Sequence, residues 1–155
     1  MKLGRDNAQA VNYYYEQGFK GLKAINPLVA YDDPSCYCIY ARAEDFSMPI
    51  LFHTGIVVRK KNERSQNVSS ARMRPIYLDT IARAFPDLKI IGAHLGNPWY
   101  QEAAEVARWN PNVFFDLTGS TLKKIILNSL LKYFGGAGNN LITIKDWMEK
   151  NPLKK

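Results

Sequence analysis

The sequence predicts an α/β fold in which parallel strands alternate with outer helices. Short apolar runs begin near residues 19, 49, 88, 112 and 141, and helical segments lie between them. Strands that alternate with helices imply crossover connections, and therefore a parallel sheet. The length of 155 residues predicts a single domain, large enough to bury roughly 70% of the surface of the unfolded chain.

Local signals set the expected bounds of each element. Asp33 followed by Pro34 is typical of a helix N-terminus, and Gly135 follows a helix end. A helix that opens at Pro75 carries one apolar stripe at helical spacing, and Pro86 ends it. The expected strands are 19–25, 49–53, 88–94, 112–117 and 141–144. The expected helices are 6–17, 34–45, 75–85, 98–109 and 121–134.

The composition excludes several classes of protein. Apolar residues make up 46% and charged residues 23%, which are values of a globular rather than a disordered chain. No apolar run reaches the roughly 18 residues that span a membrane, and the N-terminus lacks the apolar segment of a secretory signal. The two cysteines, Cys36 and Cys38, cannot form a disulfide framework, so a cytoplasmic protein is expected.

The net charge of +7 has two interpretations, an anion-binding surface or a solvated one. Much of the excess lies in residues 59–74 and 150–155. Neither stretch interleaves basic with aromatic residues as nucleic-acid surfaces do. We therefore expect no nucleic-acid partner and no membrane partner.

Both histidines of the chain stand at the end of an expected strand and begin the pattern His-x-Gly. The two copies are His53-Thr54-Gly55 and His94-Leu95-Gly96. In parallel β/α folds the carboxyl ends of the strands carry the active site, so the two imidazoles are expected to face one cavity. A neutral imidazole there binds a metal or moves a proton near neutral pH. The alternative is a pair of buried histidines whose ring nitrogens bond to backbone carbonyls.

Two charged residues end other strands of the expected sheet. Asp116 ends the strand after His94, and either lines the same cavity or accepts a hydrogen bond from a nearby backbone amide. Lys23 ends the first strand, and either binds an anionic substrate or is a surface lysine. Residues 56–73 are polar and basic without a clear period, and loops of this length are often functional.

Four stretches of the sequence carry a family resemblance. They are Gly18–Ile25 (GFKGLKAI), Pro49–Gly55 (PILFHTG), Lys89–Gly96 (KIIGAHLG) and Pro111–Gly119 (PNVFFDLTG). They resemble strands four to seven of the amidohydrolase-related family (amidohydrolase 2) of metal-dependent TIM-barrel hydrolases and decarboxylases. The likeness covers residues 10–135. It implies a partial (β/α)8 TIM barrel, with residues 1–155 as a single partial amidohydrolase-like domain.

The resemblance also implies roles for individual residues. His53 matches the metal ligand of the family's fifth strand, and His94 matches the sixth-strand histidine that acts as acid/base on metal-bound water. Asp146 follows an eighth-strand candidate and takes the place of the aspartate that completes the site. The implied cofactor is a divalent metal, with zinc as the expected ion. The family's first strand carries a His-x-His pair of ligands, and this sequence has no histidine before His53.

Together these points predict a metal-dependent hydrolase that is an incomplete copy. As an isolated chain it would be inactive or barely active and would bind zinc weakly, because a zinc site normally needs three protein ligands. The expected substrate is a small molecule that bears a carboxylate, bound by Lys23, Arg59 and Asp116. A metal-dependent decarboxylase of the same family is an alternative activity.

A second alternative is a non-catalytic remnant. Strand edges without neighbours are templates for pairing, so the chain would then self-associate into a homo-oligomer or be only marginally stable alone. Apolar side chains of the inner barrel face would be left partly open and would favour such contacts. The side chains expected there are Ile50, Phe52, Ile90 and Phe114, or their alternates.

Overall fold

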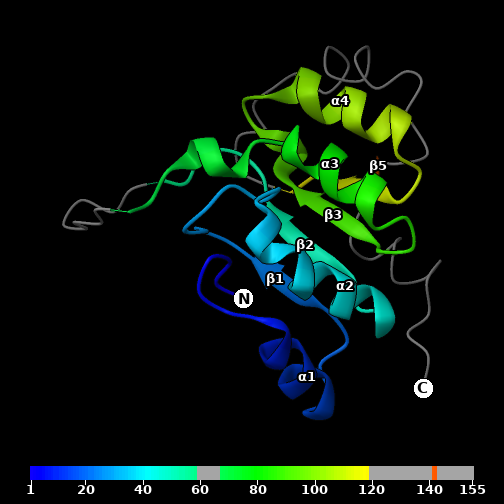
Figure 1. The fold of residues 1–155 in the computed structure, drawn as a ribbon. Helices are drawn as coiled ribbons and strands as arrows, with labels where there is room; N and C mark the ends of the chain where they lie inside the picture. The colour runs from blue at the N-terminus through cyan, green and yellow to red at the C-terminus, as the bar shows by residue number, and fades with distance from the viewer. Residues whose placement is uncertain (59–66, 119–140, 143–155) are drawn as a thin grey trace.

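The structure is a computed structural model that describes residues 1–58, 67–118 and 141–142. Its described strands form one sheet in the order β1-β2-β3-β4-β5, and every neighbouring pair is parallel (Figure 1). The strands are Leu22–Ala24, Ile50–His53, Ile90–Ala93, Val113–Asp116 and Leu141–Ile142. The predicted order of parallel neighbours is therefore confirmed.

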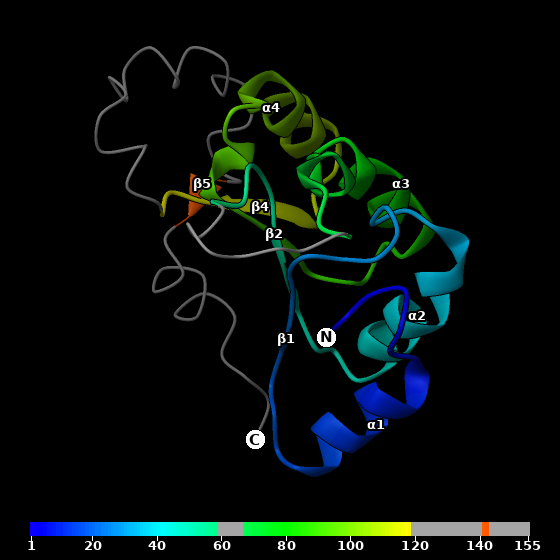
Figure 2. The same ribbon diagram turned by 90° about the vertical axis from the view of Figure 1, so that its left-hand side faces the viewer.

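The α-helices of the described residues cover one side of this sheet (Figure 2). They are α1 (Ala8–Glu16), α2 (Tyr37–Asp45), α3 (Tyr77–Ala84) and α4 (Tyr100–Trp109). Short 3-10 helices precede or join them: η1 (Pro34–Cys36), η2 (Ser70–Met73) and η3 (His94–Gly96). The helix expected over residues 121–134 lies outside the described residues. Within the described ranges, no helix is long and apolar enough to cross a membrane.

Side-chain caps explain where the first helices begin. The Asn7 side chain accepts a hydrogen bond from the Gln9 amide at the start of α1. The Asp33 side chain accepts one from the Ser35 amide, and Pro34 occupies the first helical position of η1. These short polar side chains satisfy amides that have no partner within the helix.

The first strand is shorter than the sequence predicts. The turn that ends α1 includes Gly18, whose φ is +84°, and in it the Phe19 amide donates to the Tyr14 carbonyl. The Phe19 ring also packs edge-on against Tyr14. These residues therefore complete the helix terminus instead of pairing with β2. At its other end β1 continues to Ala24, so Lys23 is the central residue of β1 and does not end it.

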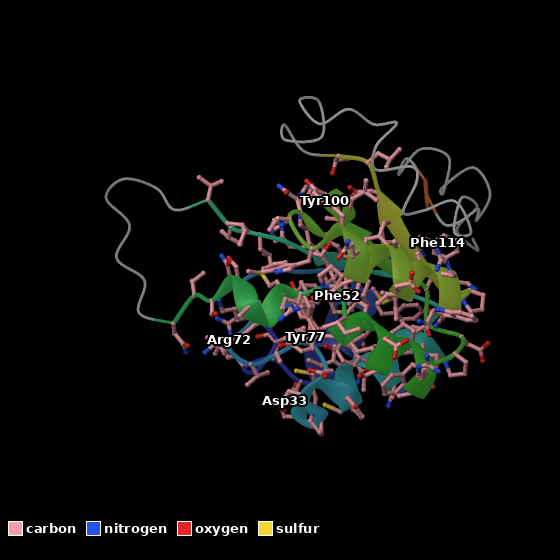
Figure 3. All side chains as sticks on the ribbon, turned by 90° about the horizontal axis from the view of Figure 1, so that it is seen from above. Asp33, Phe52, Arg72, Tyr77, Tyr100 and Phe114 are labelled. Carbon is pink, nitrogen blue, oxygen red and sulfur yellow. The ribbon has the colours of Figure 1, made fainter. Side chains whose placement is uncertain are left out.

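The two faces of the sheet differ in what covers them. One face packs under the helices, and its residues include Leu22, Ala24, Ile50, Phe52, Ile90, Val113 and Phe115, all of them buried. Of the side chains expected to remain partly open, Ile50, Phe52 and Ile90 are buried under the helices, whereas Phe114 and Leu51, an alternate of the first three, are half-buried on the opposite face. Figure 3 shows Phe52 amid the side chains at the centre of the molecule, whereas Phe114 lies toward one side.

The opposite face carries the alternate residues of each strand. Lys23 is paired with Leu51, Leu51 with Ile91, and Ile91 with Phe114. The last three form a separate small apolar cluster, in which Leu51 and Phe114 are half-buried. Because side chains alternate along a strand, His53 lies on the same face as Leu51, two residues nearer the carboxyl edge.

Candidate active site

The two histidine rings meet at the carboxyl edge of the sheet, as their matching His-x-Gly positions predict. Their centroids lie 5.0 Å apart, with an angle of 69° between the ring planes. His53 is the last residue of β2. His94 directly follows β3 and is the first residue of η3, so the strand ends one residue earlier than the sequence predicts. The parallel pairing of β2 with β3 places both residues at this edge.

The His53 ring has an unsatisfied nitrogen. Its Nε2 atom is buried and has no hydrogen-bond partner among the described residues. Burial lowers the pKa of His53, and the neighbouring His94 and Lys23 charges lower this pKa further. Contacts with the Ile56 backbone and Asp116 act in the opposite direction but do not outweigh these effects. The His53 imidazole is therefore neutral at neutral pH, which is the form that ligates metals.

The backbone of His53 is fixed from the outer side of the sheet. The Tyr31 hydroxyl donates to the His53 carbonyl at 2.8 Å and lies 3.3 Å from the Ala24 carbonyl. Tyr31 is itself fully buried, and its carbonyl accepts the Tyr40 hydroxyl. This chain of contacts joins the carboxyl ends of β1 and β2 to α2. Burial raises the pKa of the Tyr31 phenol, which therefore remains a hydrogen-bond donor.

The His94 ring, in contrast, has polar partners at its Nδ1 atom. That nitrogen lies 2.9 Å from the Thr118 hydroxyl and 3.2 Å from the Thr118 carbonyl. The His94 backbone is in the left-handed region, with φ of +66°, which is uncommon for a residue with a side chain. The backbone amide of His94 donates to Asp116 Oδ1 at 2.9 Å.

Asp116 connects the third and fourth strands at this edge. It is the last residue of β4 and is only 1% exposed. Its Oδ1 atom accepts three hydrogen bonds, from the amides of His94 and Thr118 and from the Thr118 hydroxyl at 2.6 Å. The Oδ1 oxygen of Asp116 therefore fixes the backbone at His94 and Thr118.

The loops after β2 and β3 also bond to each other. The Thr54 hydroxyl donates to the Ala93 carbonyl at 2.5 Å, and the Ile56 amide donates to the Asn97 carbonyl at 3.0 Å. Gly55 lies against Asn97 so closely that an added Cβ would stand 2.3 Å from the Asn97 carbonyl oxygen. These contacts hold the two histidines at a fixed separation.

Comparison with known proteins identifies the family. The family model described as amidohydrolase matches residues 8–137. The chain belongs to the amidohydrolase family. A search of the curated proteins found no match.

Solved structures show the fold that this amidohydrolase-family chain shares. An uncharacterised TIM-barrel protein from Bordetella bronchiseptica matches 99% of the chain with a TM-score of 0.67 and 17% identity. A 2,6-dihydroxybenzoate decarboxylase complexed with 2,6-dihydroxybenzoate matches 96% with a TM-score of 0.58 and 13% identity. A putative amidohydrolase from Staphylococcus aureus matches 90% with a TM-score of 0.56 and 18% identity. The chain spans 59%, 56% and 57% of these three structures, respectively.

The structure brings together only some of the residues expected in the site of this amidohydrolase-family chain. His53, His94 and Asp116 converge, and the Lys23 charge is close enough to affect the pKa of His53. Lys23 is exposed. Arg59 and Asp146 lie outside the described residues, so their expected roles remain predictions.

The described residues fit a divalent metal only in part. They hold no group of three histidine, cysteine, aspartate or glutamate side chains arranged to bind an ion. The orphaned Nε2 of His53 is a suitable ligand atom, but a zinc site normally needs three from the protein. The described part of the chain therefore offers a partial ligand set.

Two residues of this site were not singled out from the sequence. Thr118 is one, although Asp116 and Thr118 are spaced as in turns where an aspartate accepts the amide two residues on. That spacing was a usable signal. Tyr31 is the other, and no local pattern indicates it because its partner carbonyl belongs to His53, 22 residues away.

Proposed function

We propose that this chain carries the His53 and His94 side of an amidohydrolase active site. In this proposal the reaction is hydrolysis, His53 is a metal ligand, and His94 takes up or releases the proton. The observation that carries the proposal is the buried, unpartnered Nε2 of His53, on a ring whose centroid lies 5.0 Å from that of a second histidine ring.

This observation argues against a purely structural role for His53. A buried histidine that serves only packing normally has its ring nitrogens hydrogen-bonded, because an unpaired buried polar atom costs about 1–3 kcal/mol. The neutral state of His53 also suits ligation. A divalent metal at such a site supplies Lewis acidity toward water or a carbonyl oxygen. The remaining ligands would come from Asp146 and from residues outside the described part of the chain.

The charge on this face of the sheet supports an anionic substrate. Lys23 is exposed on the same face as His53, and a cation there attracts a carboxylate. We assign Lys23 and Arg59 to binding a small carboxylate-bearing substrate. Asp116 would contact the substrate only through Oδ2, since Oδ1 already accepts three hydrogen bonds.

Decarboxylation is the second candidate activity. The similar fold of a decarboxylase complexed with 2,6-dihydroxybenzoate, an aromatic carboxylate, supports it, as does the Lys23 cation. The two activities give different products from one substrate. An amide or ester of a carboxylic acid would report hydrolysis, whereas 2,6-dihydroxybenzoate would report decarboxylation by release of carbon dioxide.

The decisive first experiment is zinc binding by the purified chain, measured by equilibrium dialysis and metal analysis. We expect weak binding that His53→Ala abolishes. Thr54→Val is the matched control, because it changes a buried neighbour without removing a ligand nitrogen, and it should bind zinc as the parent does. Equal binding by the parent and His53→Ala would contradict the role of His53.

Turnover then tests His94. With zinc added, His94→Gln should lose any activity that the parent shows while it retains zinc binding through His53. The isolated chain should turn over slowly at best. Stoichiometric zinc that survives dialysis, together with rapid turnover, would contradict the incomplete ligand set. Sedimentation of the same samples tests the non-catalytic alternative, which predicts self-association without zinc binding or turnover.

A further inference from the structure

We propose that Thr118 is a positioning residue that keeps the proton of the His94 ring on Nδ1 and leaves Nε2 as the nitrogen available to a reacting molecule. This inference rests on the proposed function, in which His94 takes up or releases the proton of the reaction. It concerns the His94 ring, the two Thr118 oxygens beside it and the Asp116 carboxylate that accepts from Thr118, all within the described residues.

The first step is the hydrogen bonding of the Thr118 hydroxyl. A hydroxyl has one proton to donate. Its closest partner is Asp116 Oδ1, at 2.6 Å, an oxygen that also accepts the amides of His94 and Thr118 and is therefore an acceptor here. The proton of Thr118 therefore points to Asp116. The hydroxyl oxygen then has only lone pairs to offer to His94 Nδ1, 2.9 Å away.

The second step is the Thr118 carbonyl, which leads to the same conclusion independently. A carbonyl oxygen accepts and never donates. The Thr118 carbonyl lies 3.2 Å from His94 Nδ1. Two neighbouring oxygens thus both require a donor at Nδ1. The neutral ring must carry its proton there, because an unprotonated Nδ1 would face two acceptors.

The third step is the way in which Asp116 fixes His94 and Thr118 relative to each other. Asp116 is buried and accepts the amides of both His94 and Thr118, so the carboxylate fixes the backbone at both ends of the contact. The side chain of Thr118 is itself exposed. Its replacement should therefore change the state of the ring without unfolding the chain. Supporting hydrogen bonds of this kind set the tautomer of functional histidines in other sites.

The test is nitrogen–proton correlation spectroscopy of the imidazole rings, which distinguishes the two neutral tautomers. The chain has only two histidines, so His53→Ala assigns both rings. Spectra are recorded on the metal-free chain with a chelator present, above the pH range in which histidine titrates. The parent should show His94 with its proton on Nδ1. Thr118→Val removes the nearer acceptor, the hydroxyl, and keeps the carbonyl, so part of the His94 population should shift to the Nε2-protonated tautomer while the Nδ1-protonated form stays in the majority. Thr118→Ser should restore the parental pattern.

Two results would overturn the inference. One is a parental His94 ring with its proton on Nε2. The other is Thr118→Val with the same proportions of the two tautomers as the parent. Backbone amide spectra of Thr118→Val check that the fold is retained, and Thr118→Ser gives a second reading if the valine variant fails to fold.

Failure of this inference is distinguishable from failure of the proposed function, because the spectra need neither metal nor substrate. A parental proton on Nδ1 without zinc binding or turnover would leave the Thr118 assignment intact and remove the function. If turnover is present, Thr118→Val should lower it by about 10-fold, and Thr118→Ser should recover it. Turnover unchanged by Thr118→Val would contradict the positioning role.

Discussion

The two His-x-Gly turns are alike in sequence and different in structure. In the first, His53 remains in the strand, Thr54 turns its hydroxyl inward, and Gly55 takes a φ of +124°. In the second, His94, Leu95 and Gly96 are all left-handed, with φ of +66°, +50° and +67°. The same pattern therefore ends one strand in extended backbone and the other in a tight turn.

The two turns leave their histidine rings in different states, one with a free nitrogen and one held by hydrogen bonds. The first turn leaves a ring nitrogen of His53 without a partner, as a ligand requires. The second turn holds His94 by its amide and its Nδ1 atom. A left-handed backbone at a residue with a side chain costs of order 1–3 kcal/mol, so it persists only where surrounding contacts stabilise it. Here those contacts are the Asp116 carboxylate and the burial of Leu95.

The largest expected loss of stability comes from a substitution at Gly55 in the first turn, compared with the same substitution at Gly18. Gly55→Ala should lower the free energy of unfolding by about 4 kcal/mol, because it combines backbone strain with a Cβ that meets the fixed Asn97 carbonyl. Urea denaturation measures the loss. Gly18→Ala is the control, since Gly18 also has a positive φ but no atom within 4 Å of an added Cβ. It should lose only about 1–2 kcal/mol. Equal losses would show that the Asn97 contact does not constrain the first turn.

The next effect tests the buried residue of the second turn. Leu95 is 1% exposed and belongs to the main core. Leu95→Ala should lower the free energy of unfolding by about 3 kcal/mol through the cavity it leaves. Leu95→Met preserves most of the volume and should lose less than about 1.5 kcal/mol. If both variants are as stable as the parent, burial of this side chain does not hold the left-handed turn.

The corresponding position of the first turn should show a smaller effect. Thr54→Val preserves the shape and removes the hydrogen bond to the Ala93 carbonyl. We expect a loss of about 1 kcal/mol in the free energy of unfolding, the usual net value of one buried hydrogen bond. The measurement is again urea denaturation, with the parent as reference. A loss as large as that of Leu95→Ala would mean that the two turns depend on their central residues equally.

The smallest effect is a pH dependence centred on His53. The pKa of His53 is lowered in the folded chain, so the unfolded chain binds more protons as the pH falls below about 6.5. Stability should therefore be greatest above that pH and fall until the folded pKa is passed. Urea denaturation at several pH values, with a chelator present, measures this trend.

A single substitution sharpens that expectation. The charge of His94 is one of the causes that lower the pKa of His53, although burial is the larger one. His94→Gln should therefore raise the pKa of His53 while leaving it below the usual value. Ring proton spectra across the pH range report the change directly. A His53 pKa at or above the usual value in the parent would contradict the buried, neutral ring.

Local chemistry made much of the fold readable from the sequence. Asp33 with Pro34, the apolar stripe of 75–85 and the apolar runs of β2, β3 and β4 are short-range signals, and they predicted the order of helices and strands. The positions of both histidines at strand ends also follow from local pattern. Parallel pairing then brings them together, because all carboxyl ends meet at one edge.

The sequence by itself thus determined the alternation of elements, the edge at which the histidines stand and the resemblance to the amidohydrolases. Only the tertiary structure decided which face of each strand packs under the helices and which nitrogen of each ring has a partner. Phe52 and Leu51 are both apolar, so periodicity cannot tell their faces apart. His94 and Thr118 are 24 residues apart, and Tyr31 and His53 are 22 apart. Such contacts depend on the pairing of strands, which no local propensity encodes.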